Sequence, residues 1–181
     1  MLIRKSSDAD RVAIIKMHRG AFGLEEGDEV AALANDLLDD LTARPLLSLL
    51  AEENGLLLGH ILFTTVNVVD GDQLLAGQIL APLGVLPEAQ GRGVGGELID
   101  AGLEQLRACG VGLVFVLGHP AYYPRFGFKP AGVLGLKAPY PIPEEVADAW
   151  MVQELNPGYL GKVKGAVHCS DVLDRPEHWR E

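Results

Sequence analysis

The chain has 181 residues, 48% of them hydrophobic, which is enough material for one domain with a sizeable core. Fifteen basic against 25 acidic residues give a net charge of −10. This balance argues against nonspecific binding to nucleic acid or anionic membranes, because both need basic patches. No apolar run reaches the ~18 residues of a membrane span, and the first residues lack a signal-peptide core. Two distant cysteines, Cys109 and Cys169, indicate reduced thiols. We therefore expect a single cytoplasmic domain over residues 1–181, without a metal site.

The first elements along the chain are a strand and two amphipathic helices. Residues 2–5 predict a short strand, and Ser7 with Asp10 three residues later resembles a capping box at the start of a helix through Phe22. Residues 28–41 repeat apolar side chains at helical spacing and place several aspartates on the opposite, solvated face. We expect two separate helices here.

Three antiparallel strands are predicted next, over residues 46–52, 56–69 and 74–85. Asn54-Gly55 separates the first two strands and Asp70-Gly71-Asp72 the second two, and such dipeptides between apolar runs are strong hairpin signals. The three strands should form a meander.

A third helix is predicted over residues 95–108, where Gly110 makes a natural end and Cys109 is expected to be buried. Residues 112–117 form a continuous apolar strand, parallel to the strand before the helix because a long crossover separates them. Further strands are predicted over 149–155 and 165–172. The fold class is α+β (mixed α/β): a twisted mixed sheet with an antiparallel meander, one parallel strand pair and helices on both faces.

The most informative motif is the run Gln90-Gly91-Arg92-Gly93-Val94-Gly95-Gly96 between a predicted strand and a predicted helix. The first N–H groups of a helix have no partner within it, and the peptide dipoles place partial positive charge there. Glycines let a ligand approach the backbone closely. The turn therefore suits an anion such as a pyrophosphate.

One reading of these glycines is a dinucleotide site, because Gly91, Gly93 and Gly96 also satisfy G-x-G-x-x-G. That site needs an acidic residue ~20 residues further on to hold the ribose. The apolar run 111–117 ends without a carboxylate, and no repeated strand-helix units follow to complete a doubly wound sheet. The nicotinamide oxidoreductase therefore ranks last.

The same run resembles the Q/R-x-x-G-x-G/A signature of the GNAT N-acetyltransferases, a family that takes an acetyl group from acetyl-coenzyme A. Leu83-Gly84-Val85-Leu86-Pro87-Glu88 is similar to that family's fourth strand and its exit, and Tyr123-Pro124-Arg125-Phe126-Gly127-Phe128 to its Y-x-K/R-x-G-F segment. The resemblance covers residues 1–130, with 131–181 as a less certain extension. It implies acetyl-coenzyme A as cosubstrate and direct attack of a primary amine on the thioester.

The resemblance also implies roles for individual residues. Backbone groups of Leu83, Gly84 and Val85 would pair with the pantetheine arm like an added strand, with Gly84 allowing a bulge or a close approach. Residues 91–96 would cradle the pyrophosphate. The expected cofactor-binding set is Leu83, Gly84, Val85, Gln90, Gly91, Arg92, Gly93, Val94, Gly95 and Gly96, with Arg92 contacting phosphate and Gln90 as an alternative cap of the turn.

Two catalytic residues are proposed. Tyr123 occupies the tyrosine of the family segment, and a phenol stays protonated at neutral pH and can give its proton to a thiolate; Tyr122 is assigned to packing. His119 is the candidate base because it follows the strand over 112–117. Glu52, His60 and a water relay are weaker alternatives. The sequence leaves open whether the acceptor is a small molecule or a protein or peptide amine, whether the chain is a homodimer, and whether it is instead an inactive coenzyme A-binding or sensory module.

Overall fold

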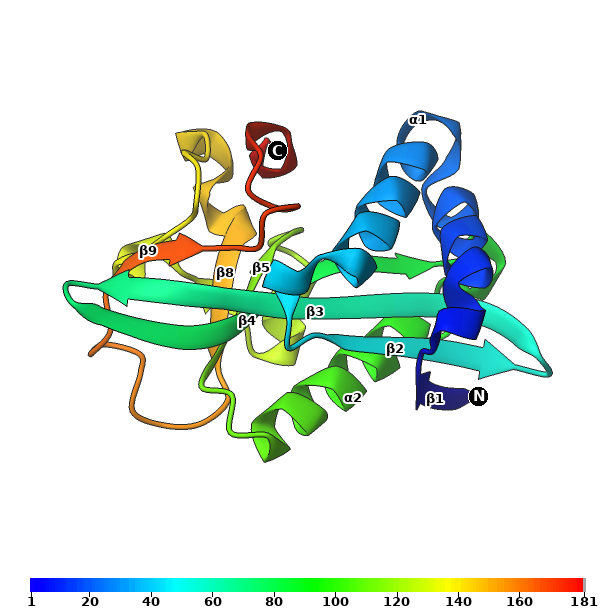
Figure 1. The fold of residues 1–181 in the computed structure, drawn as a ribbon, viewed down its shortest axis with the longest axis horizontal. Helices are drawn as coiled ribbons and strands as arrows, with labels where there is room; N and C mark the ends of the chain where they lie inside the picture. Colours follow the sequence, from blue (N-terminus) through cyan, green and yellow to red (C-terminus); the bar gives the residue numbers. More distant parts are fainter. Residues whose placement is uncertain (181) are drawn as a thin grey trace.

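The computed structural model describes residues 1–180 and shows one twisted sheet between two helical layers (Figure 1). Within these residues nine strands form the sheet, in the order β1-β2-β3-β4-β5-β8-β6, and β9 pairs with β3 and β7. The strands are β1 (Leu2–Lys5), β2 (Leu47–Glu53), β3 (Leu56–Asp70), β4 (Gln73–Val85), β5 (Leu113–Leu117), β6 (Lys129–Pro130), β7 (Leu136–Lys137), β8 (Trp150–Glu154) and β9 (Gly165–His168). The predicted α+β class with a mixed sheet is confirmed.

The predicted meander forms β2, β3 and β4, which pair antiparallel in sequence order. Asn54 and Gly55 both have positive φ, 53° and 78°, as a tight two-residue hairpin turn with right-handed twist requires. Gly71 turns the second hairpin with φ 60°. Each strand boundary lies within one residue of the predicted one, because alternating patterns flanked by turn residues define hairpins locally.

β4 and β5 are parallel, as predicted, and the helix α2 (Val94–Ala108) connects them. They pair only where residues 78–80 of β4 face residues 114–116 of β5. Over the rest of β4, residues 81–85, the edge toward β5 has no strand partner among the residues that the structure describes. The two parallel strands therefore part toward their carboxyl ends, beside the start of α2.

The two helices cover opposite faces of the sheet: α1 (Arg11–Asp39) lies on one face and α2 on the other (Figure 1). α2 buries one side of its surface, including Leu98 and Leu103. A Cβ on Gly102 would overlap the ring of Phe63, so this glycine lets the helix approach the sheet closely. No helix within residues 1–180 combines the length and the apolar character that crossing a membrane requires.

α1 differs from the two predicted helices, 7–22 and 28–41. Its two halves are separated by one non-helical residue, Gly23, with φ 74° and ψ −164°. The halves fold back on each other, so that Arg11 Nη2 lies 3.0 Å from Asp39 Oδ1. The capping box is present, with the Ser7 N–H donating to Asp10 Oδ2 at 2.8 Å, but it begins a short 3₁₀ turn rather than the helix itself.

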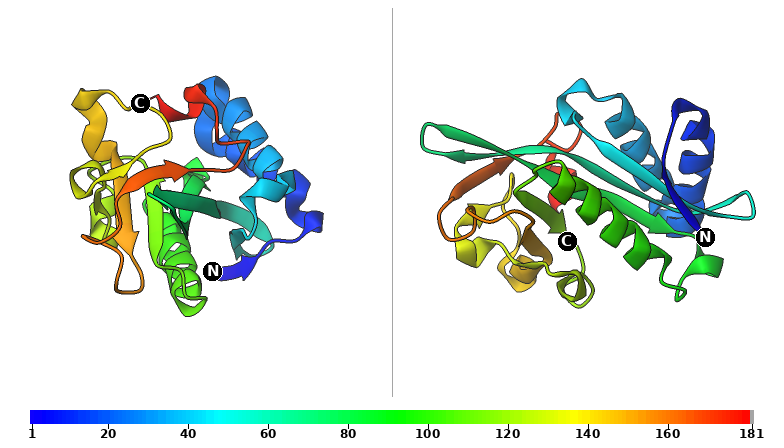
Figure 2. Two further views of the ribbon diagram at one scale, coloured as in Figure 1. Left: turned by 60° about the vertical axis from the view of Figure 1, so that its left-hand side comes forward. Right: turned by 90° about the horizontal axis from the view of Figure 1, so that it is seen from below.

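The C-terminal third extends the same sheet. β8 agrees with the prediction, whereas β9 ends at His168 rather than at residue 172. β6 and β7 were not predicted, because strands of two residues carry no periodic signal. Figure 2 shows the C-terminal segment returning beside α1, where the Val172 N–H donates to Asp40 Oδ2 at 3.0 Å just beyond the end of that helix.

The expected burial of Cys109 is wrong. Cys109 is exposed, because it is the C-cap of α2 and the chain turns away from the sheet at Gly110, which has φ 84°. Its structural role is limited to the cap, where its N–H bonds to Gln105 O at 3.1 Å.

Candidate active site

The glycine-rich turn lies where β4 ends and α2 begins. Gly91 and Gly93 have φ of 75° and 82°, a conformation that side chains with a Cβ rarely adopt. Gly93 is the N-cap of α2 and no side chain caps this end of the helix. The free N–H groups of the first helical turn and the positive end of the helix dipole are therefore available to an anion.

A cavity of about 460 Å³ opens onto this turn. It is lined by residues of the turn and by Tyr122, Arg125 and Phe126. The Arg125 guanidinium lies 4.8 Å from the centre of the Tyr122 ring, a distance at which a cation is attracted to the aromatic face. The cavity thus combines backbone donors, a cation and aromatic surface.

Gly95 lets Tyr122 lie close to the start of α2. A Cβ built on Gly95 would lie 2.8 Å from Tyr122 Oη, and one on Gly96 would lie 3.3 Å from the Phe126 ring. Burial raises the pKa of the Tyr122 phenol above its ordinary value, so this hydroxyl is a proton donor at neutral pH. The glycines of the motif therefore serve contacts as well as backbone conformation.

The segment Leu83, Gly84 and Val85 runs along the parted edge of β4. On its other edge it pairs with β3, where Gly84 faces His60. The ladder between β3 and β4 is irregular between Ile61 and Phe63, so the bulge precedes Gly84 rather than including it. Gly84 instead allows a close approach, because a Cβ there would lie 2.7 Å from His18 Nδ1.

Gln90 and Arg92 hold the turn to its surroundings. The Gln90 Nε2 donates to Val85 O at 3.1 Å, which is the capping role predicted as an alternative. Arg92 Nη2 donates to Glu53 Oε2 at 2.7 Å, at the end of β2. Val94 is buried in the core beneath the turn, so its side chain supports the turn from inside.

Tyr123 begins a short 3₁₀ helix, η4 (Tyr123–Phe126), at the parted end of β5. Its ring occupies the space that a Cβ on Gly118 would need, and it packs edge-on against the rings of Tyr122 and Phe128, with centroid distances of 5.1 and 5.8 Å. The structure therefore places Tyr123 against Gly118, just past the end of β5, and next in sequence to Tyr122, which lines the cavity.

His119 lies away from the glycine-rich cavity. It is exposed and lines a separate cavity of about 340 Å³, together with Glu145 and Asp148. Its backbone carbonyl accepts hydrogen bonds from the N–H groups of Tyr122 and Tyr123 at 3.0 and 3.3 Å. His119 thus positions both tyrosines through its main-chain carbonyl.

The weaker base candidates lie in quite different environments. Glu52 is paired with Arg4, whose Nη2 lies 3.2 Å from its Oε2. His60 is fully buried in β3 and bonds to His18 and Ser48. Within residues 1–180, no three His, Cys, Asp or Glu side chains gather as metal ligands do.

Sequence reasoning missed three features of this region. Tyr122 was assigned to packing, yet it both packs on Phe126 and lines the cavity. Arg125 belongs to the quoted segment, and its position one helical turn after Tyr122 was the available signal for their contact. His18 gave no local signal, because its contacts to Gly84 and His60 are far away in the sequence.

This arrangement is suited to an acyl-coenzyme A. A diphosphate fits a helix N-terminus with glycine-rich backbone, and an extended amide-bearing arm fits the free edge of a parted strand. A mixed sheet with both features side by side defines an acyltransferase that uses coenzyme A thioesters. The residues present fit such a ligand, because the missing side chains at Gly91, Gly93 and Gly95 leave the cradle open.

The chain belongs to the GNAT acetyltransferase family: the family model described as acetyltransferase (GNAT) domain matches residues 2–131. It is therefore an N-acetyltransferase with acetyl-coenzyme A as cosubstrate. The chain is 47% identical over 171 residues to the uncharacterized N-acetyltransferase YjhQ of Escherichia coli (strain K12), covering 93% of this chain and 91% of that one.

Two solved structures share the fold over nearly the whole chain. The GNAT family N-acetyltransferase YhbS from Escherichia coli, in complex with CoA, superimposes with a TM-score of 0.84 at 31% identity, covering 96% of this chain and 92% of that one. A GNAT family acetyltransferase from Brucella melitensis, in complex with acetyl-CoA, gives 0.72 at 31% identity, covering 96% and 97%.

Proposed function

We propose that this protein transfers the acetyl group of acetyl-coenzyme A directly to a primary amine of a small molecule, protein or peptide. The observation that carries the proposal is the cavity lined by the glycine-rich turn and by Tyr122 and Phe126, beside the free edge of β4. The relatives bound to CoA and acetyl-CoA support it. We also propose that residues 1–181 act as one cytoplasmic domain, which the continuous sheet from β1 to β9 supports.

The binding roles follow the geometry. Backbone N–H groups of residues 91–96 hold the diphosphate at the start of α2, and Arg125, which lines the same cavity, adds a cation. Main-chain groups of residues 83–85 pair with the pantetheine amides along the edge of β4 that β5 leaves free. Gln90 keeps the end of this strand in place through Val85.

The catalytic roles concern protons. The cosubstrate supplies a thioester whose carbonyl the neutral amine attacks, and no covalent enzyme intermediate is needed. Tyr123 holds a hydroxyl at the parted end of β5 and donates its proton to the leaving thiolate. The amine must lose protons, and His119 is the candidate acceptor from sequence; its side chain lines a neighbouring cavity.

The experiment has two measurements. Isothermal titration calorimetry with coenzyme A and acetyl-coenzyme A tests the cavity, and a thiol-release assay with a panel of primary amines tests transfer. Binding with turnover on at least one amine is expected. Binding without turnover on any amine would favour the coenzyme A-binding sensory module, and no binding would contradict the proposed site. Gly132→Ala is a suitable control for variants of the cavity and should behave like the wild type in both measurements, because a Cβ there meets open space.

A further inference from the structure

Four side chains form a continuous hydrogen-bonded chain across the face of the sheet that α1 covers. Ser6 Oγ lies 2.6 Å from Ser48 Oγ, Ser48 Oγ lies 2.7 Å from His60 Nε2, and His60 Nδ1 lies 2.8 Å from His18 Nε2. Both histidines have no exposed surface, and Ser48 is 7% exposed. The chain joins the residue that follows β1 to β2, β3 and α1.

One end of this chain lies next to the β4 segment proposed to bind the arm of the cosubstrate. His18 Nδ1 is buried and has no hydrogen-bond partner among the residues that the structure describes. It points at Gly84, where a Cβ would come within 2.7 Å of it. Gly84 is the middle residue of the strand segment assigned above to the thioester-bearing arm. Buried polar atoms nearly always have a hydrogen-bond partner, so the unpartnered His18 Nδ1 beside Gly84 calls for a functional explanation.

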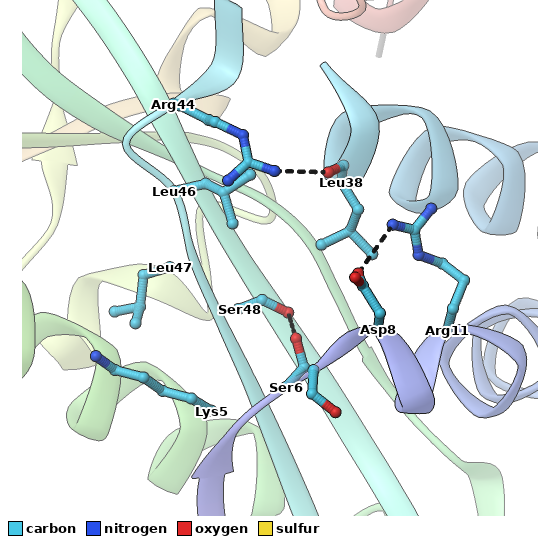
Figure 3. Close-up of a pocket in the computed structure, with 10 residues that line it drawn as sticks. Lys5, Ser6, Asp8, Arg11, Leu38, Arg44, Leu46, Leu47 and Ser48 are labelled. Atoms are coloured by element: carbon cyan, nitrogen blue, oxygen red, sulfur yellow. Dashed lines mark hydrogen bonds and ion pairs between the residues drawn. The ribbon is translucent and has the colours of Figure 1, made fainter. Parts of the chain in front are cut away.

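The other end reaches the surface. Ser6 is half-buried, and Ser6 and Ser48 line a cavity of about 220 Å³ that is distinct from the glycine-rich cavity. Figure 3 shows the two serine hydroxyls pointing at each other, with Asp8, Arg11 and Arg44 around the opening. Water in this cavity can therefore exchange protons with the serine end of the chain.

We propose that His18, His60, Ser48 and Ser6 form a proton relay that takes a proton from the acceptor amine at His18 Nδ1 and releases one to water beside Ser6. The proposal rests on the proposed acetyl transfer and assigns the base to His18 in place of His119, whose side chain lines a separate cavity. His18 is the catalytic residue of the relay, because its unpartnered nitrogen lies next to Gly84 in the segment assigned to the thioester-bearing arm; the other three residues act through it.

The proton steps balance along the chain. In the accepting state His18 Nε2–H donates to His60 Nδ1, His60 Nε2–H donates to Ser48, and the Ser48 hydroxyl donates to Ser6. When His18 Nδ1 gains a proton, each group passes its own proton to the next and Ser6 gives one to water. All four groups are neutral before and after. After the products leave, water enters the cleft. Ser6 then takes a proton from water, the protons move back along the chain, and His18 Nδ1 gives its proton to the water in the cleft. This restores the accepting state.

The relay works with neutral rings. Burial lowers the pKa of His18 to about 4, and burial together with the neighbouring His18 lowers that of His60 to about 3. No charged side chain of α1, β2, β3 or β4 within residues 1–180 contributes to either shift. At the serine end, the charged side chains of Lys5, Asp8, Arg11 and Arg44 line the cavity. A stored imidazolium is unfavourable here, so the protons must move in concert.

The first test reads the rings without a reaction. The full chain is labelled with ¹⁵N in its five histidines, and His18→Gln and His60→Gln assign the signals, with and without coenzyme A. In the wild type His18 Nδ1 should give the shift of a bare nitrogen, alone or averaged with that of N–H, because the accepting state must be populated. Ser48→Ala removes the hydroxyl that accepts from His60 and should change the shifts of both rings. A proton fixed on His18 Nδ1 in the wild type, with or without coenzyme A, would overturn the relay.

The second test separates proton transfer from folding. With an amine that the wild type acetylates, Ser48→Ala should lower kcat about 10-fold, leave the Kd of coenzyme A unchanged, and recover when imidazole is added as a proton carrier. Ser48→Thr keeps the hydroxyl and should retain most of the rate. Thr64→Val is the matched control. It also removes a buried hydroxyl, but this one has no hydrogen-bond partner among the described residues and is not part of the relay.

An equal loss of kcat in Thr64→Val, or a loss of coenzyme A affinity in Ser48→Ala, would show that the serine is only structural. Failure of the wild type to bind coenzyme A would instead contradict the proposed function. The tautomers of the two rings are read independently of that result, so the two failures are distinguishable.

Discussion

Arg92 in the glycine-rich turn donates a hydrogen bond to Glu53 at the end of β2, with 2.7 Å between Nη2 and Oε2. The guanidinium lowers the pKa of Glu53, so the carboxylate is charged at neutral pH. In the turn that we assign to the diphosphate, the cation Arg92 is therefore already paired with the Glu53 carboxylate. Ligand binding must either share Arg92 with Glu53 or separate the two.

Replacing Glu53 with Gln should strengthen coenzyme A binding. Removal of the carboxylate frees Arg92 for phosphate, and because Arg92 is exposed and Glu53 only partly buried we expect only about a threefold lower Kd. Calorimetry at low and at high salt measures the effect, which should shrink as salt screens the charges. Asp36→Asn on the exposed face of α1 is the control for net charge. Weaker binding in Glu53→Gln would mean that the pair holds Arg92 in its binding position.

Gly95→Ala should close the cavity at the start of α2. The new Cβ would lie 2.8 Å from Tyr122 Oη and push this side chain into the ligand space. We expect a Kd for coenzyme A about 10-fold higher, since one displaced contact in a tight site costs about 1.4 kcal/mol. The thermal midpoint should stay close to that of the wild type, because alanine is the better helix former.

The double variant Gly95→Ala with Tyr122→Phe tests the cause. Phenylalanine removes the hydroxyl that the new Cβ would meet, so most of the lost affinity should return. Gly132→Ala, in open space, controls for the substitution itself. Equal affinity of Gly95→Ala and the wild type would show that the ligand does not use this part of the cavity.

Tyr123→Phe should lower turnover and leave cosubstrate binding nearly intact. The ring contacts with Gly118, Tyr122 and Phe128 are kept, so only the hydroxyl is lost. Removing a general acid typically costs 10²- to 10⁴-fold, and we expect about 100-fold in kcat. Steady-state kinetics and calorimetry on the same samples measure both quantities. Tyr122→Phe is the matched comparison, and a greater loss there would assign the acid to Tyr122 instead.

The sequence predicted those parts of the fold that depend on local patterns. Asn54 and Gly55 marked a hairpin because a tight turn needs two residues with positive φ. The glycine-rich run marked the start of α2 for a similar reason. The helical hairpin of α1 was predicted as two helices with a longer connection, because nothing in the pattern showed that Gly23 alone makes the turn.

The side-chain contacts of the site were less accessible. Gly84 was expected to permit a close approach, but the approaching group, His18, lies on a helix 66 residues earlier in the chain. The bond between His18 and His60 spans 42 residues, and that between Glu53 and Arg92 spans 39. Such pairs depend on how the helices dock on the sheet, which periodicity does not encode. His60 was named only as a weak candidate base, and its hydrogen bonds give it a different role.

The two buried histidines should make folding stability depend on pH in mildly acidic solution. Their pKa values in the folded protein, about 4 for His18 and about 3 for His60, lie below the ordinary value of 6.5. Between pH 6.5 and pH 4 the unfolded chain therefore binds more protons than the folded one. The free energy of unfolding should fall as pH falls through this window, by about 3 kcal/mol for each ring that stays neutral.

Urea unfolding at pH 7, 5.5 and 4 measures this slope in the wild type and in His60→Gln. The variant loses one titrating ring, so its free energy of unfolding should fall less steeply with acid even if its stability at pH 7 is lower. His168→Gln, an exposed histidine at the end of β9, should keep the wild-type slope. The same slope in His60→Gln and the wild type would mean that His60 is protonated in the folded protein, and a charged ring there could not take part in a neutral relay.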